Sequence, residues 1–342
     1  MESGSTAGIA STYLLLVLDA WQDLGMTAEQ RQDFLLQHAL EEKQLQQPVS
    51  RVPLQVLNSL LNEALLAHNP FALAECIGAR MKLSMHGYIG FAAMTAQHVA
   101  QALQIAEKYV PLRIDHVWLR LERQGDLCHL FVEDHLNLHP LREALLLALV
   151  YGFYRMGEMA TGKRMFARVD LDFPEPPGLK AMAEATAGAL RFQQPCNRFI
   201  FQAHYLQYPL LMADPVSCRL AVEHCEKEFQ QRVRPSGWME RICARVDEVL
   251  SVEQRILALE EVAAQLHLST RTLKRRLAEH QTTWTLLVES ARKRRAALLL
   301  EEPSCRIEQV AEQLGYADVA NFTRAFKRWT GQTPSAFRSQ LR

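Results

Sequence analysis

Residues 259–266 read LEEVAAQL, and residues 307–314 read IEQVAEQL. The two stretches match at an offset of 48, and the match resumes further along the chain at an offset of 49. The resumed match pairs Leu273 with Phe322, Arg275 with Arg324, and Leu277 with Phe326. Each copy predicts a short helix, a turn and a second amphipathic helix. This is the layout of a helix-turn-helix, and the chain carries it twice.

The turn in each copy ends on a residue that favours the start of a helix. The two turns read His267-Leu268-Ser269 and Gly315-Tyr316-Ala317-Asp318. Ser269 and Asp318 have short side chains whose oxygens accept a hydrogen bond from the first turn of a following helix. The sequence therefore predicts that these two residues cap the second helix of each copy.

The second helix of each copy has side chains suited to reading DNA. Apolar Leu273, Leu277, Phe322 and Phe326 predict a buried face. The opposite faces carry Arg271, Lys274 and Arg275 in the first copy, and Asn321, Thr323, Arg324 and Lys327 in the second. Arg and Lys donate to guanine, and Asn pairs with adenine. A single basic helix face is usually only solvated, but two such faces on a repeated helix-turn-helix predict contact with DNA.

The segment between the two copies predicts a long connecting helix over Trp284–Glu301. Its eighteen residues span about 27 Å at the rise of an α-helix, and successive major grooves on one face of DNA lie ~34 Å apart. Such a helix can hold two reading helices about one turn of DNA apart. We expect further basic residues to contact phosphates, which position a protein without reading sequence: Arg276, Lys293, Arg294, Arg295 and Arg328.

The charge of the chain is unevenly distributed. All 342 residues carry 38 basic and 38 acidic side chains, a balance that by itself argues against binding nucleic acid. Residues 251–342 carry 15 basic and 10 acidic side chains, whereas the rest of the chain carries 23 and 28. A basic C-terminal quarter on an acidic body indicates a module that binds a polyanion.

The seven cysteines are scattered, and no two form a C-x-x-C pair, so the spacing typical of zinc sites is absent. No basic residue precedes Arg31, and the longest apolar stretch, Ala144–Tyr154, is about half a membrane span. No glycine-rich phosphate loop or Ser/His/Asp constellation stands out. We therefore expect a cytoplasmic protein that holds reduced thiols and has no membrane span, metal or cofactor.

The N-terminal part predicts both helices and strands. Residues 10–110 have helical periodicity, whereas 116–122 and 127–133 alternate around a Gln124-Gly125-Asp126 turn, as in a β-hairpin. The later segments predict a helix over 141–162, a strand within 165–173, a short helix near 178–187 and a strand at 199–201. From Pro215 onward the pattern is helical only, with a linker predicted at Arg234-Pro235-Ser236-Gly237.

Residues 259–338 resemble the DNA-binding domain of the AraC/XylS family. The motifs that carry this resemblance are Val310-Ala311, Leu314-Gly315-Tyr316, Phe322-Thr323-Arg324-Ala325-Phe326-Lys327, Gly331-Gln332-Thr333-Pro334 and Phe337-Arg338. The first copy departs from the family at two positions. Ala258 stands where many members have a capping Ser or Thr, which costs roughly 1 kcal/mol, and His267 replaces a frequent turn glycine.

The N-terminal part resembles the effector domain of a subgroup of these regulators that is named after an arabinose-binding domain and includes an ornithine-utilisation regulator. The motifs are Gly87-Tyr88, the hairpin around Gly125, Leu190-Arg191-Phe192, Asn197–Phe201, Leu210 and Asp214-Pro215. The subgroup name does not identify the ligand. Six polar residues lie among apolar ones and are candidates either for a pocket or for satisfied core groups: His86, Tyr88, Tyr151, Tyr154, Arg198 and His204.

Together these features predict a mixed α/β (α+β) effector domain over residues 1–235. An all-α domain over 236–342 follows, with two helix-turn-helix units joined by a long helix. The resemblance implies a transcription regulator, more often an activator, that binds double-stranded promoter DNA as a homodimer. It also implies a small-molecule effector in the first domain and contact with RNA polymerase. The sequence assigns no effector-binding residue.

Three alternatives stay open at this stage. The first domain of a ligand-independent regulator would only dimerise. Pro195-Cys196-Asn197-Arg198 is similar to the nucleophile motif of alkyl-transfer DNA repair proteins, although Asn stands where that chemistry needs His. Finally, a metal cluster can be drawn from His204, Cys218, His224 and Cys225, but these residues fall on different predicted elements.

Overall fold

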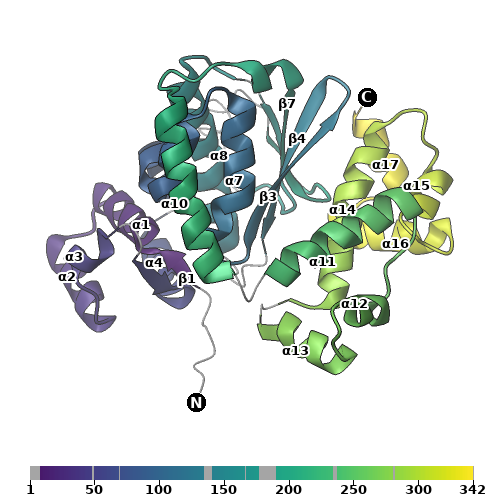
Figure 1. The fold of residues 1–342 in the computed structure, drawn as a ribbon, viewed down its shortest axis with the longest axis horizontal. Coiled ribbons are helices and arrows are strands. Elements are labelled where there is room, and N and C mark those ends of the chain that lie inside the picture. The colour runs from purple at the N-terminus through teal and green to yellow at the C-terminus, as the bar shows by residue number, and fades with distance from the viewer. Residues whose placement is uncertain are drawn as a thin grey trace.

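The structure is a computed structural model that describes residues 8–47, 50–68, 70–134, 141–165, 167–176, 190–233, 237–279 and 282–341. It confirms the predicted fold class: helices and a β-sheet form the N-terminal part, and the C-terminal part is helical (Figure 1). Within the described ranges, no helix has both the length and the apolar character needed to cross a membrane.

Helices dominate the first hundred described residues, as the periodicity predicts. They are α1 (Ser11–Asp23), α2 (Ala28–Gln37), α3 (Glu42–Leu45), α4 (Leu54–Ala67), α5 (Pro70–Arg80), α6 (Gly87–Thr95) and α7 (Val99–Tyr109). The prediction missed one strand pair: β1 (Gly8–Ala10) and β2 (Arg51–Pro53) are antiparallel. Three residues are too few for an alternating pattern to stand out from the helices on either side.

Five strands in the described residues form one sheet in the order β3-β4-β7-β5-β6. They are β3 (Val117–Gln124), β4 (Leu127–Asp134), β5 (Ala167–Asp170), β6 (Leu190–Arg191) and β7 (Asn197–Gln202). The predicted hairpin is confirmed as β3 and β4, with Gly125 at a φ of 59° in its turn. The predicted helix over 141–162 is α8 (Leu141–Thr161). The helix predicted near 178–187 lies outside the described residues.

The two faces of the sheet differ in chemistry because successive side chains of a strand point in opposite directions. Leu119, Leu130, Val169 and Phe199 belong to one apolar core with residues of α1, α4, α5 and α8. The neighbouring residues Arg120, Glu133, Asp170 and Arg198 point the other way, toward the C-terminal part of the chain. Figure 1 shows the sheet between α7 and α8 on one side and α14 on the other.

The C-terminal part is built on α14 (Trp284–Glu301), whose bounds are those the sequence predicts. The first helix-turn-helix, α12 (Leu259–Gln265) and α13 (Thr270–Glu279), shares a core with Leu287, Val288 and Ala291. The second, α15 (Ile307–Gln313) and α16 (Val319–Thr330), shares a core with Ala296, Leu299 and Leu300. Each unit therefore packs on its own half of one helix.

The remaining helices complete these layers. The N-terminal part ends with α10 (Pro215–Val233), which packs on α6 and α7 through Cys218, Ala221 and Cys225. The C-terminal part begins with α11 (Gly237–Glu248), which packs on α14, and ends with α17 (Pro334–Leu341). Residues 234–236 of the predicted linker lie outside the described residues.

The two helix-turn-helix turns have the same backbone shape but different residues at the same position. His267 has a φ of 54° and Gly315 a φ of 68°, both in the left-handed region that costs a residue other than glycine roughly 1–2 kcal/mol. We expect His267→Gly to raise the free energy of unfolding of the C-terminal part by about 1 kcal/mol, as measured by urea unfolding.

Gly315→Ala provides the opposite control. A Cβ there would lie 3.1 Å from Cγ1 of Ile256 and would keep a positive φ, so this substitution should destabilise the second unit. If His267→Gly lowers stability, the turn of the first unit is held by a contact of the imidazole and not strained by its backbone.

Candidate nucleic-acid interface and effector cavities

The capping prediction is confirmed in both helix-turn-helix units. The hydroxyl of Ser269 accepts a hydrogen bond of 3.1 Å from the backbone N–H of Thr272. The carboxylate of Asp318 accepts one of 2.6 Å from the backbone N–H of Asn321. These bonds satisfy N–H groups that a helix start leaves unpaired, and they set the direction in which α13 and α16 leave their turns.

In the first unit, the structure places the predicted DNA-reading residues on the outer face of α13. Leu273 and Leu277 are buried, whereas Arg271, Lys274 and Arg275 are exposed. Burial of the two leucines fixes the rotation of α13, so the three basic side chains must face solvent. The predicted segregation of apolar and basic faces is confirmed, and contact with DNA stays a prediction.

In the second unit, two predicted residues hold one another. The amide of Asn321 donates to Asp318 at 2.7 Å, and its oxygen accepts from the guanidinium of Arg324 at 2.6 Å. Arg324 and Lys327 are exposed, and Asn321 and Thr323 are half-buried. The bonds orient Asn321 and Arg324 in advance, which reduces the side-chain entropy lost on binding.

Polar contacts tie the second unit to the middle of α14. The guanidinium of Arg292 donates to the carbonyls of Leu314 and Gly315, at 2.9 and 3.0 Å, and lies 4.1 Å from the ring centre of Tyr316. It thus satisfies carbonyls at the C-terminal end of α15. Glu289 accepts from the indole N–H of Trp329 and, at 3.1 Å, from Arg328. The second unit is therefore fixed in orientation relative to α14.

One predicted phosphate contact is wrong. Arg294 is buried, forms an ion pair of 2.6 Å with Glu133 of β4 and also pairs with Asp247 of α11. Its position on α14 faces the sheet, so its guanidinium is inaccessible to DNA. Arg328 is exposed, but it pairs with Glu289. The basic residues on and near α14 therefore include a buried arginine that forms ion pairs within the protein as well as exposed side chains.

A second group of buried charges joins the sheet to the end of α14. The guanidinium of Arg198 on β7 is completely buried and pairs with Asp170 of β5 at 2.8 Å and with Glu301 at 2.9 Å. Arg168 also pairs with Glu301. Arg198 donates to Nδ1 of His129 at 3.2 Å. Burial, and to a smaller extent the positive charges of Arg198 and Arg168, lower the pKa of His129 to about 3. The imidazole is therefore neutral and acts as an acceptor.

We call these buried charges the junction; it was not predicted from the sequence and consists of Glu133, Asp170, Arg198, Asp247, Arg294 and Glu301. A signal was present on both sides. On each strand the charged residue stands next to an apolar core residue, as Glu133 does after Val132. Arg294 and Glu301 are seven residues apart, which places them on one face of α14. An alternating strand predicts a polar face, but the pattern is the same whether that face meets solvent or another part of the chain.

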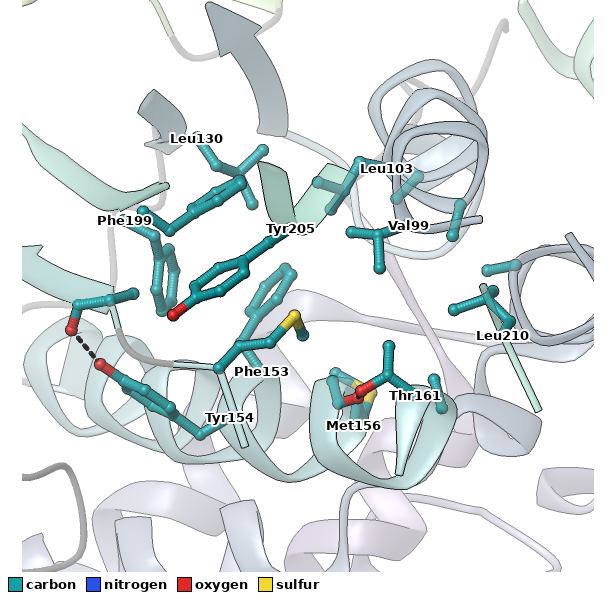
Figure 2. Close-up of a pocket in the computed structure, with 18 of the residues that line it drawn as sticks. Val99, Leu103, Leu130, Phe153, Tyr154, Met156, Thr161, Phe199, Tyr205 and Leu210 are labelled. Carbon is teal, nitrogen blue, oxygen red and sulfur yellow. Dashed lines mark hydrogen bonds between the residues drawn. The ribbon is translucent and has the colours of Figure 1, made fainter. Parts of the chain in front are cut away.

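Two apolar cavities lie on the side of the sheet that α7 and α8 cover. The first has a volume of about 160 Å³ and is lined by residues of α7, α8 and the sheet. Figure 2 shows the rings of Phe153, Tyr154, Phe199 and Tyr205 around it. The hydroxyl of Tyr154 donates to the carbonyl of Ala167, and burial raises the pKa of Tyr154 to about 12.

The second cavity has a volume of about 190 Å³ and lies beside α1, α6 and the start of the sheet. It shares Leu83, Phe153 and Met156 with the first cavity, so the two are separated by a common wall of side chains. Of the candidate pocket residues, Tyr154 lines the first cavity and His86 the second, whereas Tyr88 and His204 are exposed. Cavities of this size and lining suit apolar groups.

The N-terminal and the C-terminal part of the chain each match a known protein family. Residues 30–210 match the family described as the arabinose-binding domain of AraC transcription regulator, N-term. Residues 262–340 match a helix-turn-helix domain family. The first match alone covers more than half of the chain. The protein belongs to the AraC family of transcription regulators. The AraC-family assignment makes it a DNA-binding regulator with an N-terminal domain of the effector-binding type.

Two relatives in sequence agree with the AraC assignment. The chain is 27% identical over 296 residues to the ornithine utilization regulator of Pseudomonas aeruginosa, with 86% of each chain covered. It is 28% identical over 282 residues to the regulator VqsM of the same species, covering 78% of this chain and 83% of the relative. The crystal structure of the regulator CdpR from Pseudomonas aeruginosa aligns with a TM-score of 0.45 at 25% identity, over 90% of this chain and 96% of that one.

The repair-enzyme alternative does not fit an AraC-family regulator, because this family is not enzymatic. The structure adds a chemical reason: burial raises the pKa of Cys196 to about 12, so its thiol is protonated at neutral pH and is a poor nucleophile. The drawn metal cluster is also not assembled. The thiol of Cys218 contacts the carbonyl of Ala92, and His224 stacks on Tyr88 with ring centres 4.4 Å apart. Within the described ranges, no group of three or more metal-binding side chains occurs.

The junction allows a matched pair of substitutions in this AraC-family protein. Glu301 pairs with two arginines of the sheet, whereas its neighbour Glu302 is exposed and bonds to Ser304, two residues further along the chain. Glu301→Gln keeps the size of the side chain but removes the charge opposite Arg198. We expect it to cost about 3 kcal/mol in the free energy of unfolding, because Asp170 alone then neutralises the charges of Arg198 and Arg168.

Urea unfolding measures the loss, and hydrogen exchange locates it, with faster exchange expected in β7 and in the C-terminal half of α14. Glu302→Gln should change neither quantity. Equal effects of the two substitutions would show that the contact between sheet and α14 does not depend on the ion pairs.

Proposed function

We propose that the protein is an effector-controlled transcription activator that reads two neighbouring major grooves of promoter DNA with α13 and α16. The observation that carries this proposal is the packing of the two helix-turn-helix units on separate halves of α14. A shared rigid helix fixes the distance between the reading helices, and a site on DNA then consists of two boxes about one turn apart. Its place of action is the cytoplasm, where bacterial promoter DNA is found.

We assign base reading to the residues that the structure exposes or orients on the outer helix faces: Arg271, Lys274, Arg275, Asn321, Thr323, Arg324 and Lys327. Arg275 and Arg324 occupy equivalent positions of the repeat. Both have the fork geometry that recognises guanine.

Regulation follows from the division of the chain into a sensing part, residues 1–235, and a DNA-binding part, 236–342. We propose that an effector in the sensing part changes the junction with α14 and thereby the DNA affinity or the contact with RNA polymerase. It can do so only by binding one arrangement of the two parts more tightly than another. The apolar cavities favour this function over a ligand-independent regulator, because they offer a place for an effector.

We further propose that the protein acts as a homodimer through α6 and α10. These adjacent helices expose apolar side chains: Tyr88 and Phe91 are each 42% exposed, Val216 54% and Leu220 53%. Val216 and Leu220 are four residues apart and share one face of α10. A second copy of the chain that presents the same strip would bury it, as an isologous interface does.

Selection of bound genomic fragments by the purified protein, at a stated salt concentration, tests the double reading head. We expect a recurrent motif with two boxes about one helical turn apart. Arg275→Ala and Arg324→Ala should each cost about 1–3 kcal/mol at that motif and relax specificity within one box only. Arg245→Ala is the control, because Arg245 lies on α11 and pairs with Glu248. Uniform weakening on all sequences would instead assign both arginines to phosphate contact.

The dimer prediction has its own matched pair. Leu220→Glu introduces a charge into the apolar strip and should convert the dimer into a monomer in sedimentation velocity. Leu66→Glu changes an equally apolar residue that is 90% exposed on α4, outside the strip, and should leave the dimer intact. A dimer that survives Leu220→Glu places the subunit contact elsewhere.

A further inference from the structure

A chain of three polar side chains crosses the wall of the second cavity. The hydroxyl of Tyr13 lies 2.5 Å from Nδ1 of His86. Burial raises the pKa of Tyr13 to about 12, against a smaller lowering from the charge of Arg113 and a hydrogen bond from its guanidinium. Tyr13 therefore keeps its proton and also accepts a bond from Arg113.

The bond between Tyr13 and His86 bears on which nitrogen of the His86 imidazole carries the proton. The hydroxyl of Tyr13 can donate to Nδ1 of His86 and accept from Arg113 at the same time, because its oxygen carries two lone pairs besides its one proton. Burial, with a smaller contribution from the charge of Arg113, lowers the pKa of His86 to about 4, so the ring is neutral. With Tyr13 as the donor to Nδ1, the proton of the neutral ring is on Nε2.

Nε2 of His86 ends the chain without a partner. This nitrogen is buried, and no group in the described part of the chain forms a hydrogen bond with it. Leaving a buried polar nitrogen unpaired is costly, and such groups in proteins usually meet water or a ligand. His86 lines the second cavity, whose other walls are mainly aliphatic, with residues such as Leu16, Leu57 and Ile77.

We propose that the second cavity binds a small carboxylic acid with an apolar body, whose carboxylate accepts the Nε2–H of His86 and whose hydrocarbon part fills the aliphatic walls. This inference rests on the proposed function, which places an effector in the sensing part, and it names the chemical class of that effector. The positive charge of Arg113 behind Tyr13 favours an anionic head over a neutral one.

The carboxylate that lines the cavity does not select an ammonium group. Asp134 lines it, but Arg142 donates to both oxygens of Asp134, at 2.7 and 2.8 Å, and to Asp172 at 2.8 and 2.9 Å. These carboxylates are therefore already paired with a cation. A ligand that carries an amine instead of an acid would bury its charge without a partner.

The volume of the cavity limits the ligand. A cavity of about 190 Å³ holds a body of roughly one ring or a short chain, since an apolar cavity of about 150 Å³ takes up benzene. A longer body would have to displace Phe153 or Met156 to reach the first cavity, because both residues belong to the wall between the two cavities.

Three probes with the same eight-carbon chain test the proposal: octanoate, octylamine and 1-octanol. Isothermal calorimetry on the full-length protein without DNA measures binding directly. We expect octanoate to bind at least tenfold more tightly than either of the others. His86→Phe keeps a flat ring but removes the donor, and it should weaken octanoate binding at least tenfold while leaving the weak binding of 1-octanol unchanged.

His204→Phe is the matched control, because His204 is exposed and lines neither cavity. Should His86→Phe fail to fold, nuclear magnetic resonance of the unsubstituted protein with ¹⁵N-labelled histidine gives the answer. The Nε2 resonance of His86 should shift on addition of octanoate and not of octylamine.

Two results would overturn the assignment: equal or tighter binding of octylamine, or octanoate binding that His86→Phe leaves within twofold of its original value. Because these measurements omit DNA, they separate this proposal from the proposed function. If the protein binds octanoate but selects no DNA motif, only the proposal that α13 and α16 recognise promoter DNA is refuted. A protein that selects a motif but ignores octanoate refutes only the ligand class.

Discussion

The pairing of Arg198 with Asp170 and Glu301 is the constraint on which the arrangement of this protein depends. A fully buried guanidinium is tolerated only if carboxylates neutralise it, and here one carboxylate comes from the sheet and the other from α14. Arg294 forms the converse ion pair: the arginine belongs to α14, and its carboxylate partner, Glu133, belongs to the sheet. Each part therefore supplies the counter-charge for a buried arginine of the other part. Apolar contact alone would allow the two surfaces to slide, whereas paired charges of fixed geometry specify one register.

Because of this constraint, the side chains of α14 must form three different sets of contacts at the same time. Its apolar residues form the cores of both helix-turn-helix units, Arg292 and Glu289 fix the second unit, and Arg294 and Glu301 face the sheet. A helix offers neighbouring side chains about every 100°, so a single α14 can serve three surfaces at once. The consequence is that the DNA-reading helices cannot be oriented independently of the sensing part. Any change in the junction is transmitted to a helix that carries both reading heads.

The sequence predicted those features whose determinants are local. The helix-turn-helix units follow from a repeated periodicity and from capping residues such as Asp318, and the β3–β4 hairpin follows from alternation around Gly125. The junction was not predictable in the same way, because Glu133 and Arg294 are distant in the chain and a charged residue on a helix or strand usually faces solvent. The assignment of Arg294 to phosphate was wrong for this reason. The burial and the hydrogen bond of the His86 imidazole likewise depend on groups such as Tyr13 and Arg113, which approach it only in the folded chain.

The sheet offers the shortest physical route between the second cavity and the DNA-binding part. Val132 and Glu133 are consecutive residues of β4 and therefore point to opposite faces. Val132 lines the cavity, and Glu133 pairs with Arg294 of α14. Leu119 and Arg120 repeat this arrangement on β3, where Arg120 pairs with Asp247 of α11 at 2.5 Å. A ligand that displaces the apolar side chains on one face must move the backbone that carries the charged ones. Since an ion pair of good geometry tolerates little displacement, a small shift at the cavity is sufficient to favour one arrangement of α14 over another.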